Sequence, residues 1–423
     1  MPTGPASRDG PLPAEGIGLI PSLAVAFHLL CLFPYLAPVP LPTDTQPYAL
    51  LVSGTVLLLV GLRTPIPAAI LALLLPVAVA LLLLPADAGN LTAWRSALAY
   101  VSLFAVAAAT VLLARSGHGL SDRLLIAAVY VWTAVGAAQF LIDRGFLTGV
   151  VSQARTTVDR GVTGLATEPS HYATAAVFML LLLFLRRRER SLAGLLCIVQ
   201  VVLLAQSAQV AFLLAFAALF YGLVLARPAM LVLALLASVA AGLAWAVGLG
   251  IEARGVRILE LVSLLFDNPA LLVLADPSGN QRVAAIFFAL VGFLDHGLLP
   301  GSLADFGVYM GEQVGGGRWP LFFADPTERI LSGYGAALYE LGLFGLTVPV
   351  VMGYGLFRYF RGSPRHAFVA SALLHPLMLT AVPLALPLVG LLIGVCYGPR
   401  RYRGRDERAP TPQPIQNLDS VAP

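Results

Sequence analysis

The chain is built from apolar runs that are long enough to cross a lipid bilayer. A helix that spans the hydrocarbon core needs about 20 apolar residues, and runs of roughly this length recur between residues 17 and 397. Inside a bilayer, every backbone amide must be hydrogen-bonded within a helix or a closed barrel. The runs are continuous and do not alternate between apolar and polar residues, so they predict helices. We therefore expect an all-α, polytopic membrane protein.

Composition excludes a soluble globular enzyme. Hydrophobic residues make up 58% of the 423 positions, charged residues make up 11%, and the mean hydropathy is +0.85. Soluble domains carry about 25% charged residues, so this chain lacks the polar surface that would cover a body in water. The net charge of +4 predicts no nucleic-acid partner, because the basic residues are concentrated in short loops, as membrane topology requires.

Twelve ranges fit membrane spans. The first lacks a basic segment before it, so we interpret it as an uncleaved helix and not as a signal peptide. The last two could instead form one helix that is kinked around Pro383 and Pro387, which would give eleven spans. In order, the twelve are 17–37, 48–62, 66–84, 97–114, 122–142, 169–185, 191–206, 209–226, 229–249, 332–357, 366–381 and 384–397.

The arginines predict the orientation of these spans. Cytoplasmic loops carry an excess of basic residues, and all 26 basic residues here are arginine. With the N-terminus inside, the short outer loops hold only Arg95, Arg144, Arg155 and Arg160. The cytoplasmic side then holds 17, namely Arg8, Arg63, Arg115, Arg123, Arg186, Arg187, Arg188, Arg190, Arg227, Arg358, Arg361, Arg365, Arg400, Arg401, Arg403, Arg405 and Arg408. We therefore expect both termini in the cytoplasm.

We expect one integral membrane domain over residues 17–399, with a cytoplasmic tail at 1–16 and a disordered one at 400–423. Two outer loops interrupt the domain, at about 143–168 and 250–331. Within the second loop, residues 257–266 have helical spacing. The apolar run 283–294 is too short to span, so it should lie in the interface or re-enter the membrane. Residues 297–320 are rich in glycine and proline and predict irregular structure.

The candidate site residues cluster in these outer loops. Guanidinium groups bind pyrophosphate through paired hydrogen bonds, and Glu168 or His171 is placed to accept a proton from a hydroxyl group. Glu340 lies inside a span, where a carboxylate is costly and is functional by default. The arginines concerned are Arg155, Arg160, Arg254, Arg257, Arg282, Arg318 and Arg329.

Structural roles explain several of these residues equally well. Thr167 predicts the cap of a helix that begins at Pro169, and Glu168 suits the positive end of that helix. Arg155 and Arg160 suit lipid headgroups. Arg282 opens an amphipathic segment, where its side chain would reach toward water. The arginines near residues 318 and 329 suit a solvated loop.

The sequence predicts no metal or cofactor. It lacks an Asp-x-Asp pair, a phosphate-binding Gly-rich loop and a His-Glu-x-x-His motif. Its cysteines, Cys31, Cys197 and Cys396, each lie within an apolar run and predict neither a disulfide nor a metal cluster. The chain contains no lysine, which excludes lysine nucleophiles.

Four stretches resemble one family of bacterial membrane enzymes. Residues 161–172 (GVTGLATEPSHY) are similar to the Gly-rich, Glu-Pro-Ser helix start of oligosaccharide repeat-unit polymerases, and residues 332–346 (SGYGAALYELGLFGL) to their late Glu-Leu-Gly helix. Residues 279–282 (GNQR) and the closing VPLALPLVGLLIG also match in order and sidedness. The chain thus resembles the O-antigen polymerases, which are related to the O-antigen ligases, from residue 143 onward. It departs from the family's Arg-x10-Gly pattern at Arg155 and Arg282.

The resemblance implies a reaction and its partners. Such an enzyme polymerises repeat units linked to undecaprenyl pyrophosphate, at the outer face of the bacterial inner membrane, by metal-independent glycosyl transfer. The product would be O-antigen, capsule or exopolysaccharide, and a flippase and a chain-length regulator would act in the same pathway. Glu168, His171 and Arg282 would be catalytic. The substrate-binding residues would be Arg155, Arg160, Arg254, Arg257, Arg318, Arg329 and Glu340.

Three other functions remain open from the residues. A ligase would move the finished glycan to another acceptor. A transporter or flippase would need polar groups at the midplane of several helices, and the spans hold only scattered groups, namely His28, Gln139, Gln200 and His375. A structural protein of the cell envelope would not need the outer arginines.

Overall fold

The computed structural model describes residues 18–36, 45–152, 154–155, 161–225, 277–317, 319, 322–323, 326–327, 329–380 and 382–399. These residues form helices and turns, without a strand; one isolated antiparallel bridge joins Leu36 to Val151. The predicted all-α class is confirmed for this part of the chain.

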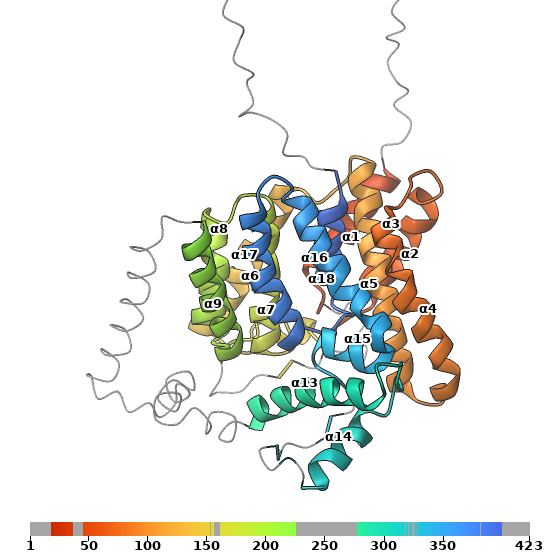
Figure 1. Cartoon of the computed structure of the whole chain (residues 1–423). Coiled ribbons are helices and arrows are strands. Elements are labelled where there is room, and N and C mark those ends of the chain that lie inside the picture. Colours follow the sequence, from red (N-terminus) through yellow and green to blue (C-terminus); the bar gives the residue numbers. More distant parts are fainter. Residues whose placement is uncertain are drawn as a thin grey trace, which may run out of the picture.

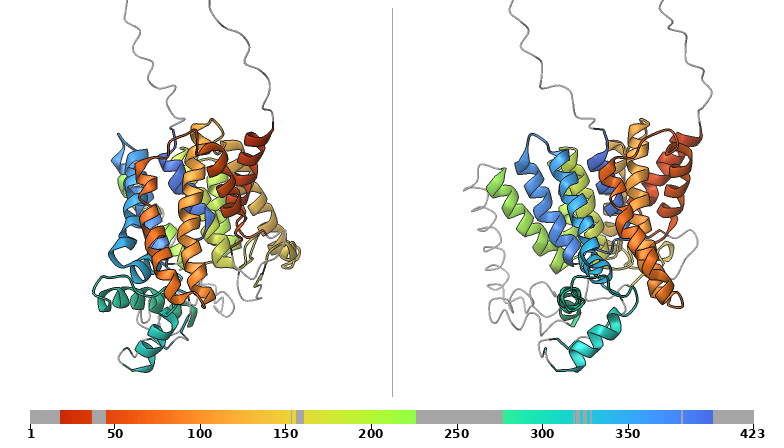
Figure 2. Two further views of the ribbon diagram at one scale, coloured as in Figure 1. Left: turned by 90° about the vertical axis from the view of Figure 1, so that its right-hand side faces the viewer. Right: turned by 45° about the vertical axis from the view of Figure 1, so that its right-hand side comes forward.

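Most of the helices lie side by side in one bundle, and α13 and α14 lie across one end of it (Figures 1 and 2). In chain order the elements are α1 (Leu19–Leu32), α2 (Tyr48–Val60), α3 (Ala68–Leu71), α4 (Leu74–Leu83), η1 (Leu84–Asp87), α5 (Leu91–Arg115), α6 (Asp122–Leu141), η2 (Thr148–Val150), α7 (Pro169–Leu185), α8 (Leu192–Val199), η3 (Gln200–Leu204), α9 (Ala208–Val224), α13 (Pro277–Asp295), α14 (Phe306–Gly315), α15 (Gly333–Leu341), η4 (Gly342–Leu346), α16 (Thr347–Tyr359), α17 (Pro364–Thr380) and α18 (Pro387–Tyr397).

Four helical runs are long and apolar enough to cross a membrane: Ala68–Asp87, Leu91–Arg115, Asp122–Leu141 and Gly333–Tyr359. Six shorter apolar helices accompany them in the described residues. Helices occupy eleven of the twelve predicted ranges, and the range 229–249 lies outside the described residues. The fold is thus compatible with a membrane protein, and the number of crossings stays a prediction.

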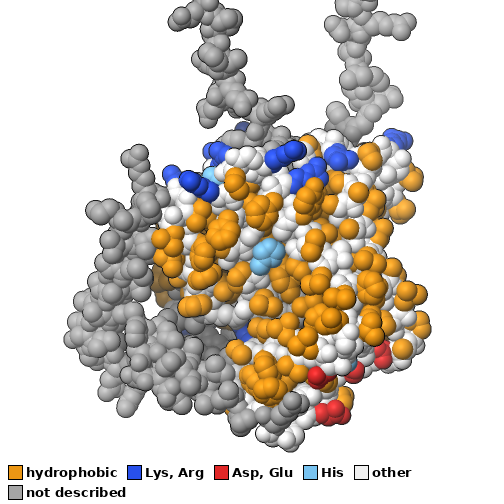
Figure 3. All heavy atoms as spheres, in the orientation of Figure 1, with side chains coloured by type: hydrophobic (Ala, Val, Ile, Leu, Met, Phe, Trp, Pro, Cys, Tyr) orange, Lys and Arg blue, Asp and Glu red, His pale blue; other side chains and the backbone are white. Residues whose placement is uncertain are grey.

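The two ends of the bundle differ chemically. Arg186, at the end of α7, lies 3.3 Å from the Asp122 carboxylate at the start of α6. Arg115, at the end of α5, donates to the carbonyl of Pro65. Arginine side chains gather at this end, and acidic side chains lie at the end that carries α13 and α14 (Figure 3). We call these ends the arginine face and the α13 face.

The last two helices are separate and antiparallel. Gly398, just after α18, packs against Ala114 near the end of α5, at the arginine face. At the opposite end, Gly333 packs against the carbonyl of Val382, in the turn between α17 and α18. This arrangement excludes the alternative of one kinked helix. Figure 1 shows α1 beginning and α18 ending at the same face.

The centre of the bundle is the contact between α5 and α18. Gly390 and Gly394 of α18 face Val106 and Thr110 of α5, and a Cβ atom on either glycine would overlap those side chains. Small residues let helix backbones approach closely, which is how helices associate in lipid, where burying apolar surface gains little. The surrounding helices expose leucine and phenylalanine side chains instead.

One predicted span begins earlier than expected, and one prediction about the second loop was wrong. The span predicted at 97–114 begins at Leu91, because the Asn90 side chain accepts from the Thr92 amide (2.8 Å) and caps the helix there. The segment 297–320, predicted to be irregular, contains α14. Phe306 and Met310, one helical turn apart, are buried in a cluster with α13 side chains, and this packing outweighs the glycines. Residues 257–266 lie outside the described residues.

The close approach of α5 and α18 can be tested with one methyl group. We expect Gly394→Ala to lower the midpoint of thermal unfolding in detergent, at a cost of about 1–3 kcal/mol, because the added Cβ overlaps Thr110. The matched control is Gly54→Ala in α2, where nothing lies within 4 Å of the added atom. Equal midpoints for the two variants would contradict this packing.

Candidate functional site

The segment that precedes α7 is held by one buried side chain. The Gln139 carboxamide on α6 accepts from the Gly164 amide (2.7 Å) and donates to the Gly164 carbonyl (2.8 Å). It also donates to the carbonyl of Phe146 (2.8 Å), at the beginning of the same loop. A buried amide with three backbone partners fixes the path of the chain into α7.

Two glycines let this segment pack closely. Gly164 has φ +57°, a left-handed conformation that favours glycine, and the Tyr172 ring lies against it. Gly161 rests on the carbonyl of Ala205, where any side chain would collide, and the neighbouring Val162 amide donates to Leu204 (2.8 Å). The support is η3, a π-helical turn, and such turns are frequent at functional sites.

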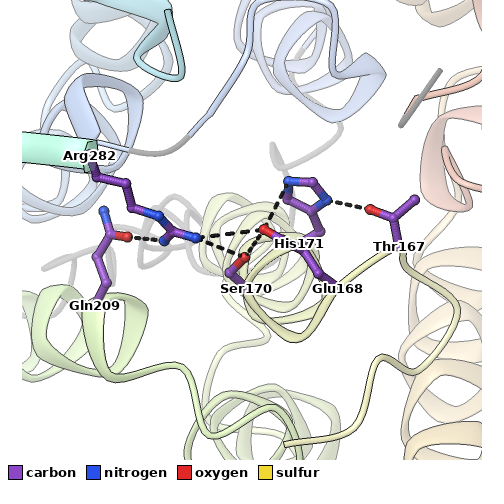
Figure 4. Close-up of polar contacts among 6 residues, drawn as sticks. All are labelled: Thr167, Glu168, Ser170, His171, Gln209 and Arg282. Carbon is purple, nitrogen blue, oxygen red and sulfur yellow. Dashed lines mark hydrogen bonds and ion pairs between the residues drawn. The ribbon is translucent and has the colours of Figure 1, made fainter. Parts of the chain in front are cut away.

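Polar side chains converge at the start of α7 (Figure 4). The His171 imidazole contacts the Thr167 hydroxyl through Nδ1 (2.6 Å) and the Glu168 carboxylate through Nε2 (3.5 Å). The Ser170 hydroxyl donates to the same carboxylate. The prediction that Thr167 caps α7 was wrong: Glu168 occupies the cap position, without a side-chain cap bond, and Thr167 instead binds His171.

Arg282 reaches this cluster from α13. Its Nη2 lies 3.6 Å from Glu168 Oε1 and 3.3 Å from the Ser170 hydroxyl, and its Nη1 donates to the side-chain amide oxygen (Oε1) of Gln209 at the start of α9. The structure therefore brings together Glu168, His171 and Arg282, the three residues predicted to be catalytic (Figure 4). We call Thr167, Glu168, Ser170, His171, Gln209 and Arg282 the α7 cluster.

The charges around Glu168 favour its ionised form. Burial of the carboxyl acts to raise its pKa, but the charge of His171, the Ser170 hydroxyl and the charges of Arg282 and Arg155 together hold the pKa below its ordinary value of 4.5. Glu168 is consequently a carboxylate at neutral pH. Two arginines and one carboxylate leave the site with positive charge, which suits an anionic ligand.

Aromatic rings fix the orientation of the imidazole. Tyr35 stacks on His171 with ring centroids 5.6 Å apart and planes 3° from parallel. The next ring along the chain, Tyr172, stacks on Trp132 (5.4 Å) and donates to its carbonyl (3.0 Å). A stacked ring restricts rotation of His171, so its Nε2 stays directed toward Glu168.

The other predicted substrate-binding residues are dispersed. Arg155 lies beside the cluster: its amide donates to the Thr167 carbonyl (2.7 Å), and its side chain is exposed. Arg329 is exposed in the segment before α15. The remaining arginines lie outside the described residues, namely Arg160, Arg254, Arg257 and Arg318.

Glu340 belongs to a second location. Its buried carboxylate accepts from Tyr100 (2.7 Å) and Ser96 (3.0 Å), both on α5. The adjacent Tyr339 packs against Gly292 near the end of α13, whereas Arg282 is near its beginning. Ten residues of α-helix extend about 15 Å, so the structure does not place Glu340 in the α7 cluster.

Sequence reasoning missed three members of this site and its surroundings. Gln209 and Ser170 both bind Arg282, and Tyr35 stacks on His171. Gln209 could have been found from the sequence, since it is a lone amide at the start of an apolar helix on the same side of the membrane as Glu168. Tyr35 left none, because its contact depends on how α1 packs. Among the described residues, no three His, Cys, Asp or Glu side chains are grouped to hold a metal ion.

Polar residues within the spans join helices to one another. The Gln200 amide donates to the Val129 carbonyl (3.1 Å) and to the Thr133 hydroxyl (2.6 Å) on α6. Tyr334 on α15 shares a hydrogen bond with His375 on α17 (2.6 Å).

No protein-family model and no curated protein matches the chain, so the geometry of the α7 cluster carries the functional argument.

The charge state of Glu168 leads to a test by pH. Because folding lowers its pKa, the carboxylate stabilises the fold fully above about pH 4.5, and this contribution is lost as the pH falls through the lowered value. We expect the thermal midpoints of the wild type and Glu168→Gln to differ most near neutral pH and to converge as the medium becomes acidic.

The control is the same substitution in an Arg282→Ala background, where one stabilising charge is gone and the pH-dependent difference should shrink. A difference between wild type and Glu168→Gln that does not change with pH would contradict the charge assignment.

Proposed function

We propose that the protein is a membrane glycosyltransferase that polymerises oligosaccharide units carried on undecaprenyl pyrophosphate. The α7 cluster is its reaction centre, and the α13 face is the outer side of a bacterial inner membrane. A flippase that delivers the lipid-linked unit and a regulator of chain length are the expected partners. The product is a surface or secreted polysaccharide.

One observation carries the proposal. A carboxylate, an imidazole and a guanidinium group, contributed by α7 and α13 and separated by more than 100 residues of chain, meet at one end of an apolar bundle. Glycosyl transfer from a pyrophosphate needs the same three groups: a proton acceptor for the attacking hydroxyl, a group that orients the acceptor, and a cation for the leaving group.

The geometry suggests a division of roles. The acceptor sugar hydroxyl attacks the anomeric carbon of the donor, the bond from that carbon to the pyrophosphate oxygen breaks, and the electron pair leaves with the pyrophosphate. Arg282 stabilises that charge, and Arg155 adds to it from the rim. The hydroxyl proton goes to Nδ1 of His171, where the acceptor hydroxyl replaces the Thr167 hydroxyl, because Nε2 faces Glu168 and the lowered pKa of Glu168 makes this carboxylate a weak base. Glu168 holds the ring and balances its charge.

The orientation of the bundle supports the outer location. The arginine face carries Arg115 and Arg186, and such basic ends lie in the cytoplasm. The α7 cluster lies at the opposite end, with Arg282 at the start of α13. This proposal includes the cytoplasmic location of both termini and the twelve spans that the sequence predicts. A lipid-linked substrate at the outer leaflet would bring its pyrophosphate to the level of α13.

The test compares the glycans of cells in which the gene has been deleted and each variant has been re-expressed. We expect Glu168→Gln, His171→Ala and Arg282→Ala each to abolish the polymer ladder while single repeat units remain, because loss of a general base or of leaving-group stabilisation costs about 100-fold or more in rate. Arg282→Lys should also shorten the chains, because lysine lacks the paired donors of a guanidinium group.

The matched control is Arg123→Ala, which removes an exposed arginine at the arginine face and should leave the ladder normal. A ladder of normal length that stays on the carrier lipid would show ligation in place of polymerisation. Unchanged glycans in all three cluster variants would rule out both reactions at this site.

A further inference from the structure

A stripe of phenylalanines runs down α9 from the residue that holds Arg282. Gln209, at the start of α9, binds Arg282, and Phe212, Phe216 and Phe220 follow it. Spacings of three and four residues keep these side chains close to the Gln209 face of the helix. We call the three the α9 stripe. It begins at the α7 cluster and points into the membrane.

The stripe is exposed at the end nearest the cluster. Phe212 is 67% exposed and Phe216 is 40% exposed. Phe216 contacts Phe220 with ring centroids 4.7 Å apart, and Phe220 contacts Phe368 of α17 at 5.6 Å. Phe216 and Phe220 therefore support each other, and their contacts end against α17, beside which α9 lies in Figure 1.

The exposed part of the stripe, Phe212 and Phe216, has the depth of one leaflet. Gln209 lies at the α13 face, and Tyr221, one residue beyond the stripe, binds Arg190 of the arginine face (2.9 Å). The seven residues from Gln209 to Phe216 rise about 10 Å along the helix, and half of a hydrocarbon core about 30 Å thick is about 15 Å. Phe212 and Phe216 consequently accompany any lipid tail in the outer leaflet whose head group is held at Arg282, and Phe220 continues the stripe toward the arginine face.

We propose that the α9 stripe binds the polyisoprenoid tail of the carrier lipid, next to the pyrophosphate held by Arg282. This rests on the proposed function, and it adds the part of the protein that selects the lipid. In lipid, association is driven by close packing and not by removal of apolar surface from water. Rigid rings in mutual contact lose little entropy on binding and contact the methyl groups and double bonds of isoprene units over a large area.

The site would then bind both ends of an amphiphilic ligand, the polar head and the apolar tail. Arg282 recognises the phosphate, and the α9 stripe recognises the tail, so a shorter isoprenoid phosphate should bind more weakly. Ordinary phospholipids share the phosphate but lack the methyl-branched tail, and they should compete poorly. The stripe thus gives the reaction centre a preference for the carrier over the lipids that surround it.

Binding of undecaprenyl phosphate and dimethylallyl phosphate to the purified full-length protein tests this inference. The two probes share a head group, but the single isoprene unit of dimethylallyl phosphate is too short to lie along the stripe, and native mass spectrometry compares them directly. We expect the wild type to prefer undecaprenyl phosphate, and Phe212→Ala/Phe216→Ala to lose about tenfold in affinity for it, with no loss for dimethylallyl phosphate.

The matched control is Phe140→Ala/Phe357→Ala, which removes two rings of similar exposure (40% and 50%) from α6 and α16 and should keep the wild-type preference. Both double variants remove exposed side chains, and a thermal midpoint confirms that each is folded.

Three results overturn the inference: no binding of undecaprenyl phosphate by the wild type, an unchanged preference in Phe212→Ala/Phe216→Ala, or an equal loss in the control. The proposed function has a separate readout, the glycan ladder of Glu168→Gln. If that ladder is lost while the tail preference is unaffected by the α9 substitutions, the reaction centre stands and only the tail site is wrong.

Discussion

The absence of water inside a bilayer is the constraint on which the rest of this structure depends. A polar group within the bundle must find its partner in the protein, and the partners found here are specific. Gln139 binds two loop carbonyls and an amide, Gln200 binds α6, and Glu340 binds two hydroxyls of α5. The contacts of Gln200 and Glu340 join segments far apart in the chain. Satisfying buried polar groups therefore also determines which helices are neighbours, and it fixes the loop that carries Glu168.

The α7 cluster consists of side chains on a fixed segment at the start of α7 and of Arg282, which a separate helix, α13, contributes. Thr167, Glu168 and His171 lie on the segment that Gln139 and the two glycines hold in place, and Tyr35 stacks on the imidazole. Arg282 comes from α13, which lies across the end of the bundle and packs its small residues against α15. The position of the guanidinium group thus depends on the seating of α13. The α7 cluster lies at the beginning of α13 and the Glu340 carboxylate lies near its end, so the length of the helix separates them.

The amphiphilic substrate that we propose would account for the polar and apolar features that occur side by side. Gln209 binds Arg282, and the rings of the α9 stripe follow Gln209 along the helix. One ligand with a phosphate head and a long tail can therefore contact both the guanidinium group and the rings. The membrane keeps such a ligand at the correct depth, and the protein needs to supply only lateral contacts and charge. This economy is consistent with a reaction centre made from a few side chains at the edge of an otherwise apolar bundle.

The sequence by itself determined the fold class, the positions of most helices and the residues worth testing. Apolar runs of bilayer length force helices, and a Glu-Pro-Ser segment after glycines marks a helix start, so Glu168 and His171 could be found by reading the chain. Local patterns could not show that Thr167 binds His171 instead of capping α7, that α14 forms among glycines, or that Glu340 lies apart from Arg282. Those outcomes depend on packing between segments up to hundreds of residues apart. Only the tertiary structure decided that Gln209 and Tyr35 belong beside the catalytic candidates, because their contacts arise from how α9 and α1 pack against the rest of the bundle.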